Sequence, residues 1–316
     1  MSENNTPVAE NNVNTVINES AVMKQKNMEK VTVLDKTMRI FVKIMTYTFL
    51  VIMALIVLFP FYFMLISSLK TIEEFELTVP TLFPQYLDWH NYVEVFQNED
   101  LQLWTLFGNT MYVGIVSTIL SLVITVLSAF AFARLEFKGK NALFAALLGT
   151  MMIPGELFTI TNYATVFHLN WTNTYTVLIV PFLVSVFYIY LLRQNFLQIP
   201  NELYLAAKVD GTSDIKYLWR VMIPLALPSI ISITILKMMG AWNSYMWPNL
   251  VTSANAEHNR QLITNGLRKA FTDAAGVTDI PVQMAACALV SIPLFLVFIF
   301  FRKYIMKGVS RSGIKG

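Results

Sequence analysis

Charged residues are scarce in this chain, and cysteine and histidine are nearly missing. Of its 316 residues 14% are charged, whereas about a quarter are charged in an average soluble domain. The single cysteine, Cys287, excludes an internal disulfide. His90, His168 and His258 lie far apart and lack the spacing of metal ligands. Long charge-free runs account for the low charge, so the composition predicts a multi-span membrane protein.

Several functional motifs are also missing from the sequence. It contains no G-x-x-x-x-G-K-[ST] phosphate-binding loop, so we expect no nucleotide chemistry in this chain. A membrane-embedded enzyme, the alternative of another class, would need a clustered metal or acid–base set, and none is evident. An ion-coupled transporter would need several carboxylates within its spans or an inverted repeat, and only Glu156 qualifies. No cofactor, metal or nucleic-acid partner is therefore expected.

Six apolar runs are long enough to cross a hydrocarbon core of roughly 30 Å. They predict an all-α membrane protein with six transmembrane helices, at about 44–68, 109–133, 142–165, 175–192, 225–247 and 281–301. Residues 1–26 lack aromatic side chains and are expected to form a disordered tail. Residues 28–43 have the pattern of either a short amphipathic helix or a plain linker. The expected organisation is a tail over 1–40 and a transmembrane domain over 41–316.

Lysine and arginine predict the orientation of these spans. With the N-terminus inside, eighteen of the 23 basic residues fall in inner segments and four in outer segments. Because basic residues favour the cytoplasmic side, both termini are predicted to be cytoplasmic. The acidic segment 71–100 is then extracytoplasmic.

An inner segment at 194–224 is long for a loop and has helical patterns. Its first helix is predicted to end at Gly211, in the position that favours a left-handed cap. A second helix is capped by Thr212 or Ser213 and is expected to end before the fifth span, at Pro224. Both helices have an apolar side, which packs either under its own spans or into a groove of another protein. These apolar sides consist of Leu203, Ala206, Ala207, Ile215, Leu218, Trp219 and Met222.

The sequence NELYLAAKVDGTSDIKYLWRVMIPLALP at 201–228 resembles the coupling loop of permease subunits of ATP-binding-cassette (ABC) importers. The family pattern is Glu-Ala-Ala, three residues, Gly and a closing Ile/Leu-Pro. Its matches here are Ala206, Ala207, Asp210, Gly211 and Pro224. Leu205 replaces the family's glutamate, and Glu202, one turn earlier, is a candidate substitute. The resemblance implies that these residues dock onto an ATPase.

Other segments resemble the carbohydrate branch of this family. They are SSLKTIEEF, SAFAFARLEFKGK, WNSYMWP and the C-terminal run that ends in SGIKG. The resemblance covers about residues 45–316, and it points to the smaller permease of maltose-type and glycerol-phosphate-type importers. It further implies that the terminal SGIKG, with Lys315, contacts the ATPase subunits, and that the outer loop 251–280 reaches a binding protein.

The resemblance also implies that the chain is one subunit of a larger transport complex in a bacterial-type plasma (inner) membrane. This chain would pair with a second, larger permease, with two ATPase subunits that bind ATP and Mg, and with an extracytoplasmic solute-binding protein. Within membrane lipid, the two permeases would import a carbohydrate by alternating access. An oligosaccharide is the first expectation, and an anionic sugar or a sugar or glycerol phosphate is the alternative.

Five residues form the candidate substrate path. Glu156 and Lys237 fall within spans, where charges usually face the bundle interior or a wet cavity. Each contacts either substrate or a structural hydrogen-bond partner, and Lys237 can also extend to the interface. Trp242, Asn243 and Tyr245 lie near the outer end of the fifth span, either in an aromatic belt or on a sugar-binding surface. Whether substrate contacts come mainly from this chain or from its partner stays open.

Overall fold

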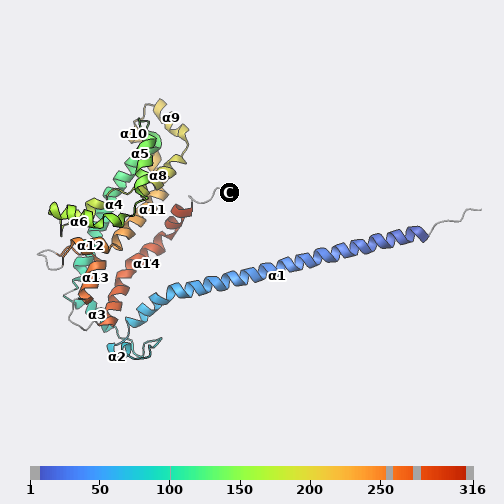
Figure 1. Ribbon diagram of the computed structural model, residues 1–316, viewed down its shortest axis with the longest axis horizontal. Helices are drawn as coiled ribbons and strands as arrows, with labels where there is room; N and C mark the ends of the chain where they lie inside the picture. The colour runs from blue at the N-terminus through green and yellow to red at the C-terminus, as the bar shows by residue number, and fades with distance from the viewer. Residues whose placement is uncertain (1–7, 100, 254–258, 273–278, 311–316) are drawn as a thin grey trace, which may run out of the picture. The chain divides into compact units, whose positions relative to one another are not determined.

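The computed structural model describes residues 8–99, 101–253, 259–272 and 279–310. Over these residues every regular element is a helix, and no strand is present (Figure 1). The chain divides into two compact units, Met1–Phe63 and Met64–Gly316.

The described part of the first unit, residues 8–63, is a single helix. α1 (Val8–Ser67) begins upstream of the apolar stretch Met38–Ser67, and its last turn belongs to the second unit. Residues 8–26 are therefore helical, which differs from the disordered tail expected there. The physical reason is that the sequence from 8 to 59 contains neither glycine nor proline, so nothing interrupts a helix that continues into the span.

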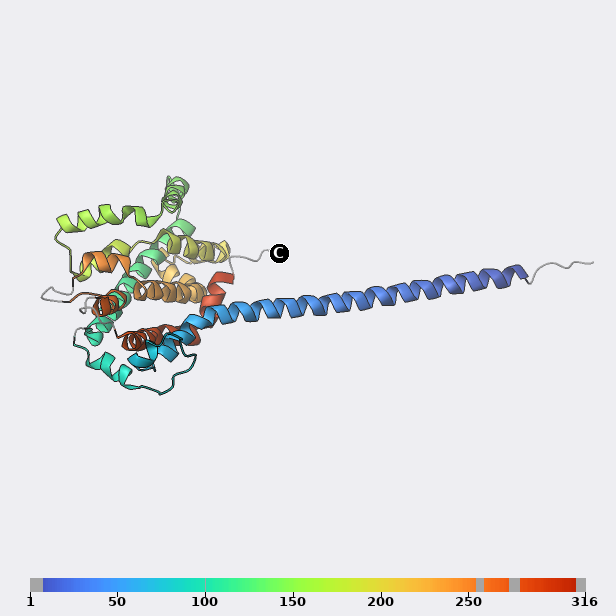
Figure 2. The same ribbon diagram turned by 60° about the horizontal axis from the view of Figure 1, so that its bottom comes forward.

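The second unit is a bundle of packed helices (Figures 1 and 2). α4 packs against α8 and α11, α11 packs against α14, and α14 packs against α3. Small side chains on α4 permit this close packing, as they commonly do between membrane helices. Ser117 and Ser121 are buried, and Gly114 lies against the side chain of Met238. The remaining helices are α2 (Ile72–Phe75), α3 (His90–Gln97), α4 (Leu103–Arg134), α5 (Lys140–Thr150), η1 (Gly155–Phe158), α6 (Thr159–His168), α7 (Tyr175–Ile179), η2 (Val180–Phe182), α8 (Val186–Leu197), α9 (Asn201–Val209), α10 (Asp214–Tyr217), η3 (Leu218–Met222), α11 (Ile223–Trp242), α12 (Met246–Val251), α13 (Ile263–Thr272) and α14 (Ile280–Ser310).

Four helices of the described residues are long and apolar enough to cross a membrane, and the count rises to six if each of two bent pairs is one span. The four are Met38–Ser67, Leu103–Arg134, Asp214–Trp242 and Ile280–Lys303. The bent pairs coincide with the third and fourth expected spans. α5 and α6 meet at 82°, and the pair made by α7–η2 and α8 bends by 44°. Pro154 lies at the first break, where a proline disfavours continuation of the helix.

Pro224 does not separate the second inner helix from the fifth span, so that expectation was wrong. α10, η3 and α11 form one continuous helix from Asp214 to Trp242. η3 is a π-helical turn, and the Ile223 N–H bonds to the carbonyl of Leu218, five residues back. The wider turn accommodates the proline that follows, because Pro224 supplies no N–H of its own.

Candidate functional site

The turn between α9 and α10 is closed by a complete C-terminal cap. Gly211 has φ +69°, and its N–H donates to the Lys208 carbonyl at 3.0 Å. The Thr212 N–H donates to the Ala207 carbonyl at 2.8 Å, which completes a Schellman motif. Ser213, rather than Thr212, caps α10, since its side chain accepts from the Lys216 N–H. The predicted left-handed cap at Gly211 is therefore present.

The two faces of this helix–Gly–helix unit, residues 201–222, differ in burial. No residue of α9 is fully buried, and Val209 is 88% exposed. Leu203 and Leu205 are exposed as well, whereas Tyr204 and Ala207 pack against the bundle. Glu202, Ala206 and Asp210, which the sequence singles out, are also exposed. The unit thus packs partly under its own spans and leaves an apolar face of α9 uncovered.

On the second helix of the unit, Tyr217, Leu218 and Met222 are fully buried in the same core. Ile215 and Trp219 are exposed, at 56% and 64%. The apolar side predicted from the sequence is therefore divided between the chain's own core and solvent.

A polar cluster of Tyr204, Lys208 and Asp214, which we call the Asp214 brace, connects the two helices of the unit. Asp214 accepts a hydrogen bond from the Tyr204 hydroxyl and pairs with the Lys208 ammonium, each at 2.7 Å. The Tyr204 ring also packs against Tyr217 at 5.1 Å between centroids. The hydrogen bond to Asp214 raises the pKa of Lys208, so the ammonium keeps its charge at neutral pH. Because these contacts join α9 to α10, the unit is held as one body.

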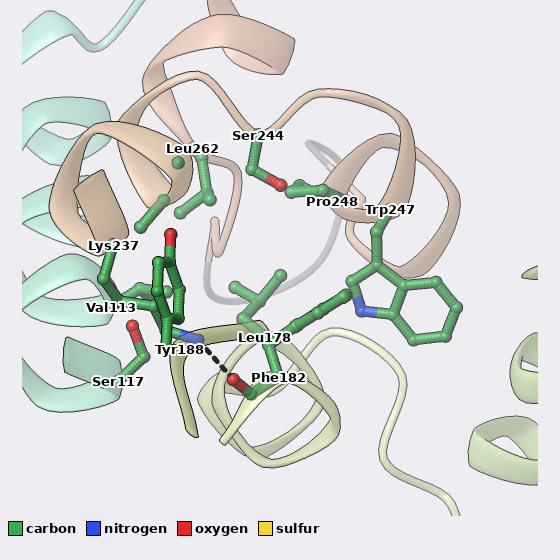
Figure 3. A pocket seen from close by; sticks show the side chains of 12 residues that line it. Val113, Ser117, Leu178, Phe182, Tyr188, Lys237, Ser244, Trp247, Pro248 and Leu262 are labelled. Carbon is green, nitrogen blue, oxygen red and sulfur yellow. Dashed lines mark hydrogen bonds between the residues drawn. The ribbon is translucent and has the colours of Figure 1, made fainter. Parts of the chain in front are cut away.

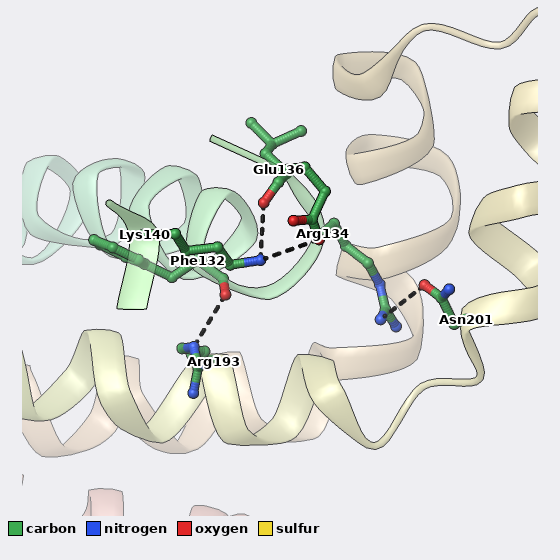
Figure 4. Close-up of polar contacts among 7 residues, drawn as sticks. Phe132, Arg134, Glu136, Lys140, Arg193 and Asn201 are labelled. Atoms are coloured by element: carbon green, nitrogen blue, oxygen red, sulfur yellow. Dashed lines mark hydrogen bonds and ion pairs between the residues drawn. The ribbon is translucent and has the colours of Figure 1, made fainter. Parts of the chain in front are cut away.

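Two arginines, which we call the arginine clamp, connect the C-terminal ends of α4 and α8, and Figure 4 shows one of them, Arg193, at the Phe132 carbonyl. Arg134, the buried last residue of α4, donates to the carbonyls of Phe196 and Ile199, at the α8–α9 elbow. Arg193 of α8 donates to the Phe132 carbonyl of α4 at 3.0 Å and lies 4.1 Å from the Phe144 ring centroid. Helix C-termini carry unpaired carbonyls and a partial negative charge, which an arginine satisfies. Each helix end is thus capped from its neighbour.

A cavity of about 280 Å³ lies between α4, η2, α8, α11 and α12 (Figure 3). We call it the Lys237 cavity, after its one charged lining residue. The Lys237 ammonium donates to the Phe182 carbonyl at the end of η2 and lies 5.9 Å from the Tyr188 ring centroid. The other lining residues are Val113, Ser117, Leu178, Gly240, Ala241, Ser244, Trp247, Pro248 and Leu262.

The five predicted substrate-path residues are not brought together. Glu156 is exposed on η1, at the break between α5 and α6, and it does not line the Lys237 cavity. Trp242 is buried in a core cluster, edge-on to Phe107. Asn243 is exposed, and Tyr245 faces Arg268, whose guanidinium lies 5.3 Å from the ring centroid. Of the five, Lys237 alone lines the cavity.

Hydrogen bonds from α4 hold segment 259–263 in place. The Asn109 amide donates to the carbonyls of Asn259 and Gln261, both at 2.9 Å. The Thr110 hydroxyl accepts from the Ile263 N–H at 2.8 Å. The Tyr175 hydroxyl donates to Asn109 and receives a bond from Arg260. Segment 259–263 is therefore packed against α4.

A second segment, 70–92, is organised around two buried charged side chains, Lys70 and Glu74. Lys70 is 2% exposed and donates to the Thr81 carbonyl at 2.6 Å. The Glu74 carboxylate accepts from the Thr81 hydroxyl and from the Gln85 N–H. Burial raises the pKa of Glu74, but these hydrogen bonds and Lys70 outweigh it, so the net pKa lies below the usual value.

Sequence reasoning missed the arginine clamp, the Asp214 brace and most of the cavity lining. Arg134 and Arg193 entered the sequence reasoning only as basic residues near the ends of spans, which does not indicate the carbonyls that they reach. The cavity residues Phe182 and Tyr188 have no signal, because apolar and aromatic residues occur throughout the spans. Lys315 lies outside the described residues. Among the described residues, no group of three or more His, Cys, Asp or Glu could hold a metal.

Comparisons with known proteins agree on one family. The family model described as "Binding-protein-dependent transport system inner membrane component" matches residues 21–311. The arabinooligosaccharides transport system permease protein AraQ of Halalkalibacterium halodurans is 31% identical over 265 residues, which cover 83% of this chain and 93% of that protein. The trehalose/maltose transport system permease protein MalG of Thermococcus litoralis is 29% identical, over 84% of this chain and 94% of that protein.

A solved structure is also similar to this chain. It is a bacterial ABC transporter involved in the import of the acidic polysaccharide alginate. One chain of it matches with a TM-score of 0.75 and 25% sequence identity, over 84% of this chain and 96% of its own length.

Proposed function

The chain belongs to the family of binding-protein-dependent transport system inner membrane components, and from this premise we propose that it is a permease subunit of an ATP-driven carbohydrate importer. Relatives named for arabinooligosaccharide and for trehalose/maltose transport support a sugar substrate. An oligosaccharide moves inward by alternating access between two packings of the permease. Both termini face the cytoplasm, in accordance with the distribution of basic residues.

The observation that carries this proposal is the capped, braced unit with an uncovered apolar face on α9. A rigid amphipathic helix that leaves its apolar face exposed is suited to a groove on another protein. The groove belongs to an ATPase subunit, and Glu202, Ala206, Ala207, Asp210 and Gly211 lie at or beside the contact. Glu202 and Leu205 are both exposed and are i, i+3 neighbours, so Glu202 can present a carboxylate beside the position that Leu205 occupies. Lys315 makes a second ATPase contact.

The mechanism follows from the contacts that join the helix–Gly–helix unit to α4 and α11. Closure of the ATPase dimer displaces α9, and the Asp214 brace moves α10 with it. Because α10 continues through η3 into α11, the displacement reaches the span that carries Lys237. Arg134 passes the same displacement from the α8–α9 elbow to α4. The bends between α5 and α6 and between η2 and α8 are places where a span can change angle without unfolding.

The partners supply what this chain lacks. Two ATPase subunits bind ATP and Mg and carry out hydrolysis, and this chain itself holds no cofactor and acts as a permease rather than an enzyme. A second, larger permease completes the path. An extracytoplasmic solute-binding protein delivers the sugar to an outer surface that includes the ordered segment 259–263.

Uptake by the reconstituted complex tests this function. The two permeases and the ATPases are placed in proteoliposomes, and import of a labelled oligosaccharide from its binding protein is measured. Uptake should require ATP and should survive collapse of the proton gradient by an ionophore. Uptake that persists without ATP and stops when the gradient collapses would overturn the proposal in favour of an ion-coupled transporter.

A further inference from the structure

We propose that the Lys237 cavity binds one ring of an anionic saccharide, with Lys237 paired to the carboxylate or phosphate of that ring. This inference rests on the proposed importer function and specifies the substrate class for this chain. Lys237 has unused hydrogen-bond donors and no carboxylate partner among the described residues, and the cavity wall has aromatic and hydroxyl groups that suit a sugar.

Lys237 has donors to spare. An ammonium group carries three N–H donors, and a single hydrogen bond, to the Phe182 carbonyl, is found for Lys237 among the described residues. The Tyr188 ring centroid, 5.9 Å away, is near the limit of a cation–π contact. Two donors therefore remain for a ligand in the cavity.

Lys237 also has no negative partner among the residues that the structure describes. The ion pairs between described residues involve Lys140 and Lys208, and no Asp or Glu lines the cavity. A lysine within a membrane span is normally paired or faces water, because an isolated charge there is costly. The Phe182 carbonyl at the end of η2 carries only a partial negative charge, so its hydrogen bond does not neutralise the Lys237 ammonium. A transported anion supplies the full counter-charge.

The remaining wall of the cavity suits a sugar ring. Phe182, Tyr188 and Trp247 provide aromatic faces for C–H groups, and Ser117 and Ser244 provide hydroxyls. Figure 3 shows the Lys237 ammonium beside Tyr188 and directed to the Phe182 carbonyl. At about 280 Å³ the cavity lies at the small end of ligand pockets, which are about 300–1,000 Å³. It therefore accommodates one ring, with the rest of an oligosaccharide extending beyond it.

A protection experiment on the assembled permease–ATPase complex tests this site without the solute-binding protein. Ser244→Cys places a thiol in the wall while Lys237 is kept, and Cys287→Ser removes the chain's native thiol. The rate of thiol modification is measured with galacturonate, galactose 6-phosphate or neutral galactose as the probe. These probes differ at one carbon, so their comparison isolates the charge.

We expect half-protection by an anionic probe at a concentration at least about tenfold below that of galactose, the factor for one charge-assisted hydrogen bond. The two anions show whether a carboxylate or a phosphate is preferred. Lys237→Arg should keep this preference. Lys237→Gln keeps a donor for the Phe182 carbonyl but removes the charge, so it should abolish the preference.

Equal protection by galactose and both anions, or no protection by any of them, would overturn the inference, as would an anion preference that survives Lys237→Gln. If Lys237→Gln does not assemble, the comparison of probes on the parent complex still decides. Failure of the importer proposal is separate, because it would appear as a lack of ATP-driven uptake in proteoliposomes.

Discussion

The left-handed cap at Gly211 provides a direct test of the coupling unit. Gly211 has φ +69°, and a Cβ at this position would meet no atom within 4 Å. A substitution therefore adds backbone strain without a clash. An L-residue in this region costs about 1–2 kcal/mol. That cost corresponds to a roughly 5- to 30-fold increase in the population in which the cap is open.

An open cap should loosen the connection between α9 and α10. We expect Gly211→Ala to raise the number of ATP molecules hydrolysed per sugar imported, and Gly211→Val to raise it further, because a β-branched side chain restricts the backbone more. Gly211→Asn should remain close to the parent, since asparagine tolerates the left-handed conformation. The assay measures phosphate release and sugar uptake in the same proteoliposomes.

Gly139 is the matched control. It has φ +81°, precedes α5, and also has no atom within 4 Å of a built Cβ. Gly139→Val should therefore lower the melting temperature of the complex about as much as Gly211→Val while leaving the ratio of hydrolysis to uptake unchanged. A Gly211→Val complex with the parental ratio would refute the proposed role of this turn.

Three further predictions concern polar side chains that hold neighbouring segments of the bundle together. Arg134→Met should destabilise the complex by about 1–3 kcal/mol for each buried carbonyl left without a donor. Thermal unfolding should show no comparable loss of stability for Arg220→Met, at an exposed position. Equal losses for the two variants would contradict the arginine clamp. Asn109→Leu removes the donor to two carbonyls of the outer segment 259–263, so amide hydrogen exchange should quicken there, whereas Asn249→Leu on α12 should leave it unchanged. Because the folded pKa of Glu74 is depressed, its contribution to stability is present above the usual carboxyl pKa and is lost as the pH falls through the folded value. The protection factors of amides in segment 70–92, which correct the exchange rate for its intrinsic dependence on pH, should therefore fall on acidification in the parent but not in Glu74→Gln, and a parental profile for that variant would argue against the buried carboxylate.

Local signals in the sequence predicted the helices and the turn between α9 and α10. Apolar run length identified the candidate spans, and the glycine followed by Thr-Ser identified a cap that depends on a few neighbouring residues. Pro224 misled because its effect depends on whether the preceding turn can widen, and η3 does widen. The capping rule therefore succeeded where the backbone conformation is decided within one turn.

Contacts between distant segments could not be predicted in this way. Arg134 bonds to carbonyls 62 and 65 positions along the chain, and Lys237 bonds to one 55 positions away. Every residue offers a carbonyl, so the sequence does not indicate which one an arginine or lysine will reach. The same reason explains why Trp242 was expected in the path but lies in a core cluster, whereas Tyr188 lines the cavity.

α4 connects three levels of the molecule. Near its N-terminal end Asn109 holds segment 259–263, near its middle Ser117 lines the Lys237 cavity, and at its C-terminal end Arg134 holds the α8–α9 elbow. α4 contains no proline and runs unbroken for 32 residues, or about 48 Å. The third and fourth expected spans are bent, by 82° and 44°. In the proposed importer the stiff helix therefore links the ATPase side, the sugar cavity and the outer surface, and the bent pairs absorb the change in angle. A displacement of α9 then reaches segment 259–263 through Arg134 and α4, in parallel with the route through the Asp214 brace into α11.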